Sequence, residues 1–235
     1  MIPTSMFIVW GVGPSTAEQW YCQGLRSLDD LKRANSEQQN FLNKHQKIGL
    51  DLFDDLDERM DRSEAAQIET YVRKSVSELN SSLEVIACGS FRRGKGRLID
   101  FIPSFCSYLA RNRVSYYLTL YLVILGTCGD LDILITHPNE SNVPDGLFQE
   151  IITKLHNEQF LTHDLTFQKD GNQKKYLGVC KLPNQACAQN TKHRRLDIIV
   201  VPPTEKATAM LYFTGSAHFN RSMRLMATKK GMSFI

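Results

Sequence analysis

The chain has 235 residues, of which 42% are hydrophobic and 23% charged, and its formal net charge is +3. This composition excludes an intrinsically disordered chain, and the length allows one or two domains with a real hydrophobic core. The six cysteines show no Cys-x-x-Cys spacing and have no paired histidines nearby, which argues against a zinc site and a redox motif. Free thiols favour a reducing, intracellular compartment.

Charge is spread unevenly along the chain. Residues 51–64 contain seven acids and two arginines, whereas residues 191–231 contain eight lysines and arginines and two acids. The basic C-terminal part favours a polyanionic partner, although a solvated charged face would give the same pattern. Residues 1–9 are apolar but lack a basic segment and a small-residue cleavage site, so they do not predict a secretory signal.

The N-terminal region has the pattern of a helix-hairpin-helix. Residues 11–17, Gly-Val-Gly-Pro-Ser-Thr-Ala, precede one helical pattern, and Ser27 is a candidate N-cap for a second helix. Gly11 and Gly13 would let the backbone pass close to DNA, where N–H groups at a helix start can bind a phosphate. A Gly-x-Gly turn also joins ordinary helices, so both interpretations stay open.

A long amphipathic helix is predicted from Ser63 onward. Apolar side chains recur at helical spacing from Ile68 to Leu79, and the polar residues 80–82 end the pattern. This helix serves packing rather than chemistry. Residues 46–57, which precede it, have a mixed pattern of helix and turn.

Glycines and cations follow a predicted strand at residues 83–88. Residues 89–96 are Gly-Ser-Phe-Arg-Arg-Gly-Lys-Gly. Backbone N–H groups, a hydroxyl and guanidinium groups all bind phosphate oxygens, so this stretch is a candidate triphosphate site.

Two carboxylates, Asp130 and Asp132, stand one residue apart at the start of an apolar run. On a strand their side chains would share one face, while Leu131, Ile133 and Ile135 point the other way. Carboxylates placed together repel unless a cation lies between them. Asp197 occupies the same setting in the strand-like residues 194–201, and three convergent carboxylates predict a Mg²⁺ site. An Asp-x-Asp pair alone is also common in loops and turns.

The remaining elements alternate between helix and strand. We expect a helix over residues 145–160, a strand over 176–180, a helix over 204–213 capped by Thr204, and another helix from Gly215 and Ser216 to about residue 230. His137, His156 and His163 lack metal-ligand spacing and are interpreted as surface or core residues.

Four segments together resemble the family X DNA polymerases. They are Gly89-Ser90 with the arginines after it, Gly129-Asp130-Leu131-Asp132, Arg194-Arg195-Leu196-Asp197, and Tyr212-Phe213-Thr214-Gly215-Ser216 with the residues up to Arg221. The resemblance implies an α+β fold, with a nucleotidyltransferase (polymerase beta-like) palm on a mixed β-sheet and a helical fingers subdomain containing the helix-hairpin-helix. The implied division is fingers at residues 1–58, palm at 59–201 and the start of a truncated thumb at 202–235.

The resemblance also implies a role for individual residues. It makes Asp130, Asp132 and Asp197 the catalytic carboxylates and the ligands of Mg²⁺, with Mn²⁺ as a substitute, and Asp197 a candidate proton acceptor. The implied nucleotide-binding residues are Arg59, Gly89, Ser90, Arg93, Tyr212, Phe213, Gly215 and Asn220. The implied DNA-binding residues are Gly11, Gly13, Ser15, Arg195, Arg221 and Arg224.

Residues 97–126 depart from the family pattern, because in family X only a short loop separates the Gly-Ser pair from the Asp-x-Asp pair. The block contains an apolar run at residues 114–125, which is too short for the roughly 20 residues of a membrane-spanning helix. Its foreign composition favours a translated intron or a splice variant. An accommodated surface insertion is the alternative.

The resemblance implies template-directed, Mg²⁺-dependent transfer of a deoxynucleotide to a primer 3′ hydroxyl in short-gap DNA repair, by base excision repair or end joining. The implied partners are gapped primer-template DNA and deoxynucleoside triphosphates, with no membrane, a monomeric state and a nuclear location. Two alternatives stay open: a catalytically impaired fragment that only binds DNA, and a nucleotidyltransferase acting on another acceptor. The family's lyase domain has no counterpart in the sequence, so no lyase activity is expected.

Overall fold

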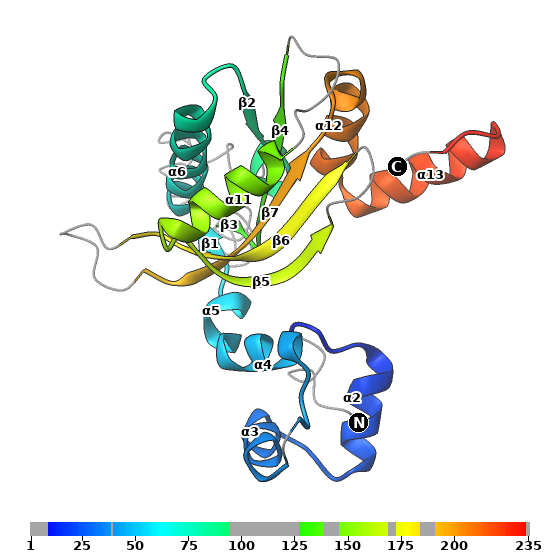
Figure 1. The fold of residues 1–235 in the computed structure, drawn as a ribbon. Helices are drawn as coiled ribbons and strands as arrows, with labels where there is room; N and C mark the ends of the chain where they lie inside the picture. The colour runs from blue at the N-terminus through cyan, green and yellow to red at the C-terminus, as the bar shows by residue number, and fades with distance from the viewer. Residues whose placement is uncertain are drawn as a thin grey trace, which may run out of the picture. The chain divides into compact units, whose positions relative to one another are not determined.

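The computed structural model of the chain describes residues 9–38, 40–94, 127–138, 146–168, 173–183 and 191–233. The chain forms two compact units, Met1–Glu58 and Arg59–Ile235 (Figure 1). The block expected to be an insertion, residues 97–126, lies outside the described residues. Within the part of the chain that the structure describes, no helix is both long and apolar enough to cross a membrane.

The first unit is helical. Its helices are α2 (Pro14–Cys22), α3 (Leu28–Glu37), α4 (Lys44–Asp51) and α5 (Phe53–Asp57). Ser27 and Asn43 form capping boxes at the starts of α3 and α4, which confirms the N-cap predicted at Ser27. Apolar side chains from these elements and their connections form a small core of Val9, Trp20, Leu31, Leu42 and Leu50.

The two glycines of the predicted hairpin differ in what the structure requires of them. Gly11 has a φ of +82°, and a Cβ placed there would lie 3.1 Å from the backbone nitrogen of Gln46 in α4. Gly11 is therefore required by close packing inside this unit. Gly13, the N-cap of α2, has a φ of −93°, and none of the described atoms lies within 4 Å of its Cβ position.

The second unit is built on a five-stranded sheet with the strand order β2-β4-β7-β6-β5. These strands are β2 (Glu84–Ala87), β4 (Leu131–Thr136), β5 (Leu161–Gln168), β6 (Lys174–Lys181) and β7 (His193–Val200). β4 and β7 are parallel, and the other neighbouring strands are antiparallel. A separate antiparallel pair joins β1 (Met60–Asp61) to β3 (Thr127–Cys128). The predicted α+β fold with a mixed sheet is confirmed.

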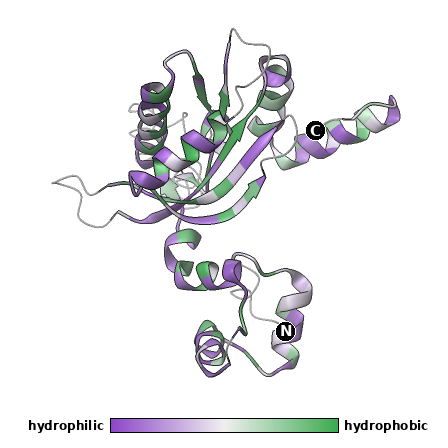
Figure 2. Ribbon diagram, in the orientation of Figure 1, coloured by the Kyte–Doolittle hydropathy of each residue, from purple (hydrophilic) through white to green (hydrophobic). Residues whose placement is uncertain are grey.

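Helices cover both faces of this sheet (Figure 1). α6 (Arg62–Leu79) and α11 (Leu147–Asn157) pack on one face, in a core that includes Leu131, Ile133 and Ile135 of β4. α12 (Lys206–Thr214) packs on the other face, in a core with Leu134 and Ile199. The alternation predicted for β4 is therefore confirmed. Figure 2 shows the mainly hydrophobic β4 in the sheet and many hydrophilic residues along α6.

Some elements differ from the sequence predictions. β4 begins at Leu131 after a bend at Gly129, so Asp130 precedes the strand instead of lying on it. α12 begins after a 3₁₀ turn, Pro203–Glu205, and its N-cap is Glu205 rather than Thr204. The last helix, α13, spans Ala217–Lys229. β5 was not predicted, although Leu161, Leu165 and Phe167 alternate with polar residues along it. Its register against β6 shifts twice.

Candidate active site

Asp132 and Asp197 lie side by side at the centre of the sheet. They are register partners on the parallel strands β4 and β7. Asp132 shares its strand face with Leu134, and Asp197 shares its face with Ile199, so both carboxylates lie on the face covered by α12. Asp130 lies two residues before Asp132, at the start of the strand. The predicted convergence of Asp132 with Asp197 is thus produced by a pairing of two distant segments.

The three aspartates influence one another electrostatically. Burial, followed by the charges of Asp130 and Asp197, raises the pKa of Asp132 to about 7. Burial also raises the pKa of Asp197, with a smaller contribution from Asp130, while Arg195 opposes the rise. Carboxylates held this close disfavour one another's charged form, which makes a cation the natural counterpart of the group.

Arg195 forms an ion pair with Asp197 in this structure. The Nη2 atom of Arg195 lies 2.9 Å from each carboxylate oxygen of Asp197. Within the described residues, no three His, Cys, Asp or Glu side chains are arranged to hold one metal ion. The donor set fits Mg²⁺ in chemistry, because it consists of hard carboxylate oxygens that repel one another. Sharing a cation requires the carboxylates to move closer together.

The Gly-Ser turn packs directly against Asp132. α7 (Gly89–Arg92) begins at Gly89, whose φ is +57°, and a Cβ there would lie 2.0 Å from the Oδ2 atom of Asp132. The backbone nitrogen of Cys88 donates a hydrogen bond of 2.8 Å to the carbonyl oxygen of Asp132. Only glycine permits this approach. The structure therefore places the candidate phosphate-binding turn at the aspartates.

Two arginines fix the segments beside this turn. Arg93 donates a hydrogen bond from Nη1 to the carbonyl oxygen of Thr214 at the end of α12, and its charge weakly opposes the rise in the pKa of Asp132. Arg59 donates to both Oγ1 and the carbonyl oxygen of Thr127, at 2.8 Å each. Arg93 and Gly215 are in close contact, because a Cβ at Gly215 would lie 3.1 Å from Nη1 of Arg93. Several of the predicted nucleotide-binding residues thus lie around one site.

The residues predicted to contact the sugar and base form a local network. Asn220 donates from Nδ2 to the carbonyl oxygen of Tyr212 at 2.8 Å, and Arg224 donates to the Tyr212 hydroxyl. The rings of Tyr212 and Phe213 meet edge to face at 5.0 Å. These contacts hold the end of α12 against α13. They leave the ligand roles of the residues as predictions.

The predicted DNA-binding residues belong to different parts of the chain. Gly11, Gly13 and Ser15 lie in the first unit, whereas Arg195, Arg221 and Arg224 lie in the second. Arg221 bonds His218 on its own helix at 2.9 Å. Nothing in these contacts assigns the six residues a ligand.

A structural ion pair that the sequence motifs did not predict lies beneath the site. Arg194 is buried, and its Nε and Nη2 atoms donate to the two carboxylate oxygens of Glu64 at 2.7 and 2.9 Å. These two hydrogen bonds connect the first turn of α6 to β7, at a position three residues before Asp197. The Arg-Arg dipeptide was the available signal, but alternation along β7 sends Arg194 to the α6 face and Arg195 to the opposite face.

Comparisons with known proteins define the class of protein. Residues 59–102 and 124–203, more than half of the chain, match the DNA polymerase beta palm. Residues 6–57 match the fingers domain of DNA polymerase lambda, and residues 209–234 match the DNA polymerase beta thumb. The gap between the two palm matches lies within the block at residues 97–126. The chain belongs to the family X DNA polymerases, as its motifs predicted.

Individual relatives agree with this assignment. The chain is 46% identical over 226 residues to DNA polymerase lambda of Rattus norvegicus, covering 96% of the chain and 32% of that protein. It is 31% identical over 229 residues to DNA polymerase lambda of Arabidopsis thaliana, covering 95% of the chain and 36% of that protein. A DNA nucleotidylexotransferase of Xenopus laevis is 27% identical over 225 residues, 94% of the chain and 42% of that protein. The chain spans about a third of the length of the two lambda relatives.

Proposed function

We propose that this chain catalyses template-directed addition of a deoxynucleotide to a primer 3′ hydroxyl, in which the hydroxyl oxygen bonds to the α-phosphorus of the triphosphate and pyrophosphate leaves. The observation that carries the proposal is the pairing of Asp132 with Asp197 across β4 and β7, with the Gly89 turn packed against Asp132. Carboxylates next to a phosphate-binding turn can bring a triphosphate and an attacking hydroxyl together. If Asp132 and Asp197 only stabilised the fold, there would be no need for two partly buried carboxylates to lie side by side, where their charges repel each other.

The aspartates supply the chemistry. Mg²⁺, or Mn²⁺ in its place, held by Asp130, Asp132 and Asp197 would neutralise charge on the triphosphate and lower the pKa of the primer hydroxyl. Asp197 accepts the hydroxyl proton on a carboxylate oxygen once Arg195 has moved off it. Arg195 can make this movement because its side chain lies on the same face of β7 as Asp197. After it releases Asp197, Arg195 lies beside the primer end.

The triphosphate binds at the turn between β2 and α7. Gly89 and Ser90 present backbone N–H groups to phosphate oxygens, and Arg93 and Arg59 supply guanidinium groups. Both arginines now bond carbonyl oxygens, of Thr214 and Thr127, which a phosphate would replace as acceptor. The support for this arrangement is that Gly89 at the start of α7 packs against Asp132, and that Arg93 caps the end of the same short helix.

The end of α12 and the start of α13 select the sugar and the base. Tyr212, Phe213 and Gly215 pack against the deoxyribose, and Asn220 bonds the minor-groove edge of the incoming base. Arg224 contacts the template, and Arg221 the DNA backbone. Gly11, Gly13 and Ser15 contact the primer strand through the backbone at the start of α2. The supporting observation is that Gly13 leaves the first turn of α2 open within its unit.

The partners follow from this proposal. They are gapped primer-template DNA and deoxynucleoside triphosphates, used by a monomer in the nucleus during base excision repair or end joining. The names of the lambda relatives support the substrate class.

A DNA-binding fragment without activity is the second candidate. Two observations favour it. Arg195 is ion-paired with Asp197, and the block at residues 97–126 separates the Gly-Ser turn from Asp130 in the sequence. A nucleotidyltransferase acting on another acceptor ranks third, because the fingers match and residues 212–216 would have no role in it.

Primer extension on DNA with a one-nucleotide gap tests these candidates. The assay compares the intact chain, a version lacking residues 97–126, and Asp197→Asn in each background, with Mg²⁺ present. Extension that disappears with Asp197→Asn supports the proposal. If neither background extends the primer while both still bind gapped DNA in a salt-dependent way, the DNA-binding fragment is the correct function.

A further inference from the structure

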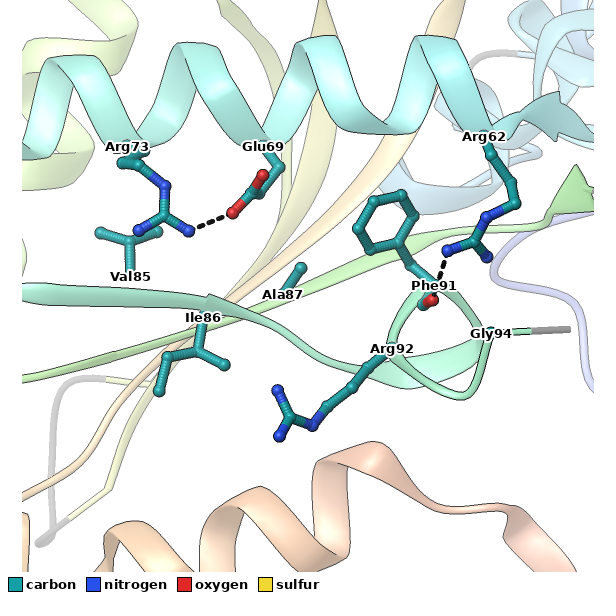
Figure 3. A pocket seen from close by; sticks show the side chains of 9 residues that line it. All are labelled: Arg62, Glu69, Arg73, Val85, Ile86, Ala87, Phe91, Arg92 and Gly94. Atoms are coloured by element: carbon teal, nitrogen blue, oxygen red, sulfur yellow. Dashed lines mark hydrogen bonds and ion pairs between the residues drawn. The ribbon is translucent and has the colours of Figure 1, made fainter. Parts of the chain in front are cut away.

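A pocket of about 390 Å³ opens along β2, next to the candidate phosphate-binding turn (Figure 3). β2 is the edge strand of the sheet, and α6 and α7 form the other walls. Ala87 and Phe91 pack on the α6 side of the sheet, and Ile86 packs on the α12 side. Asp132 and Asp197 are not among the lining residues, so the pocket needs its own explanation.

The pocket is lined by more positive than negative charge. Arg62, Arg73 and Arg92 contribute three guanidinium groups, and the only acid among its lining residues is Glu69, which pairs with Arg73. Arg62 donates from Nη2 to the carbonyl oxygen of Phe91 at 2.8 Å, and its buried Nη1 has no hydrogen-bond partner among the described residues. Figure 3 shows the side chains of Arg73 and Arg92 on opposite sides of the β2 ribbon. An anionic ligand must therefore be extended to reach both.

The backbone of β2 offers a second set of contacts. Cys88 donates its N–H inward to Asp132 on β4. Backbone groups alternate in direction along a strand, so those of Ile86 also point inward, and those of Val85 and Ala87 point to the outer edge. Among the described strands, none pairs with this edge. An edge that no described strand pairs with can act as a template for another strand.

We propose that the outer edge of β2 binds an extended acidic peptide segment of a partner protein as an added strand. Val85 and Ala87 pair with the backbone of the peptide, and its acidic side chains alternate between Arg73 on one face and Arg92 on the other. Apolar side chains of the peptide contact Val85, Ile86 and Phe91. A nucleic-acid strand would satisfy the arginines but would not form a ladder with the backbone of β2.

Fluorescence anisotropy tests this proposal with the full 235-residue chain. The probe is a short, capped, labelled peptide in which pairs of glutamates alternate with pairs of valines, so that each face of the added strand carries both residue types. A second peptide of the same sequence carries an N-methyl group on every backbone amide, so neither of its edges can donate hydrogen bonds to a strand. The protein variants are Arg73→Glu and Arg92→Glu. Lys74→Glu is the matched control, because it makes the same charge change on α6 outside the pocket.

We expect saturable binding of the unmodified peptide, weakened at least about tenfold by Arg73→Glu and by Arg92→Glu. Lys74→Glu should change the affinity by less than about twofold, and N-methylation should abolish binding. Equal binding of the N-methylated peptide would overturn strand addition. Equal loss with Lys74→Glu would show nonspecific attraction, and binding of a single-stranded oligonucleotide but not of the peptide would make the edge a nucleic-acid surface. None of these outcomes depends on polymerase activity.

Discussion

The replacement Asp132→Asn should stabilise the protein at pH 8 when no divalent cation is present. Asp132 has a raised pKa of about 7 in the folded chain, against 3.8 as its ordinary value. Between these pH values the folded protein holds a proton that the unfolded chain has released. Stability therefore falls as pH rises through this window, and it is lowest above about pH 7. Asparagine carries no charge, so the variant's free energy of unfolding does not fall in this way as the pH rises.

The size of the effect follows from the shift. A rise of about three pKa units corresponds to roughly 4 kcal/mol. The Asp132 side chain is partly exposed, so solvent screening reduces the repulsion from Asp130 and Asp197, and we take about half of that value. A gain of about 2 kcal/mol corresponds to roughly 4–8 °C in melting temperature for a protein of this size.

Thermal unfolding in a chelator at pH 5 and pH 8 measures this effect. The intact protein should melt at a lower temperature at pH 8 than at pH 5, and Asp132→Asn should remove most of the difference. Asp51→Asn changes an exposed aspartate and serves as the control. A variant that is less stable than the original protein at pH 8, or one that keeps the full pH dependence, would refute the role assigned to burial and to the neighbouring carboxylates.

Further predictions concern the site and its supports. Mg²⁺ at pH 8 should raise the melting temperature of the intact protein but not that of Asp132→Asn, as differential scanning fluorimetry with and without the cation would show. Gly89→Ala should cost roughly 2 kcal/mol in urea unfolding, because its Cβ would meet Asp132 at a positive φ; an unchanged midpoint would contradict the close approach. Arg194→Met should cost roughly 2 kcal/mol by leaving Glu64 without its two hydrogen bonds, and Glu64→Gln in the same chain should recover part of the loss. Asp61→Ala should cost about 1 kcal/mol at pH 7. Backbone and Ser63 hydrogen bonds lower the pKa of Asp61, so this contribution is lost as pH falls below 3.8, and the two proteins should converge in acid urea titrations.

Local patterns were sufficient to predict the strand positions of Asp132 and Asp197. Alternation along β4 fixed which residues enter the core with α6 and which side chains share a face with Asp132. Alternation could not show that β4 and β7 are parallel neighbours, because that pairing joins segments far apart in the sequence. The resemblance to family X supplied the convergence that the local patterns lacked.

The remaining mismatches have local causes. Asp130 does not follow the two-residue period because the chain bends at Gly129 before β4 begins. β5 does carry a pattern of period two, with Leu161, Leu165 and Phe167 on one parity, but the polar His163 interrupts the apolar positions. Arg195 was expected at the primer end, and in the structure it pairs with Asp197 on the same strand face. Such side-chain partners depend on which ligands are present.

The ends of the block at residues 97–126 explain how the palm can form around it. On the N-terminal side, Arg62 bonds the carbonyl oxygen of Phe91 and Arg93 bonds that of Thr214. On the C-terminal side, Thr127 is held by Arg59 and by the pairing of β3 with β1. Both sides are therefore fixed by contacts with residues outside the block. Because the closure cost of a loop grows only slowly with its length, the arrangement of Asp132 with Asp197 does not require a short connection between these ends. The effect of the block on activity therefore depends on whether it obstructs the site, and comparing the two backgrounds in primer extension measures that.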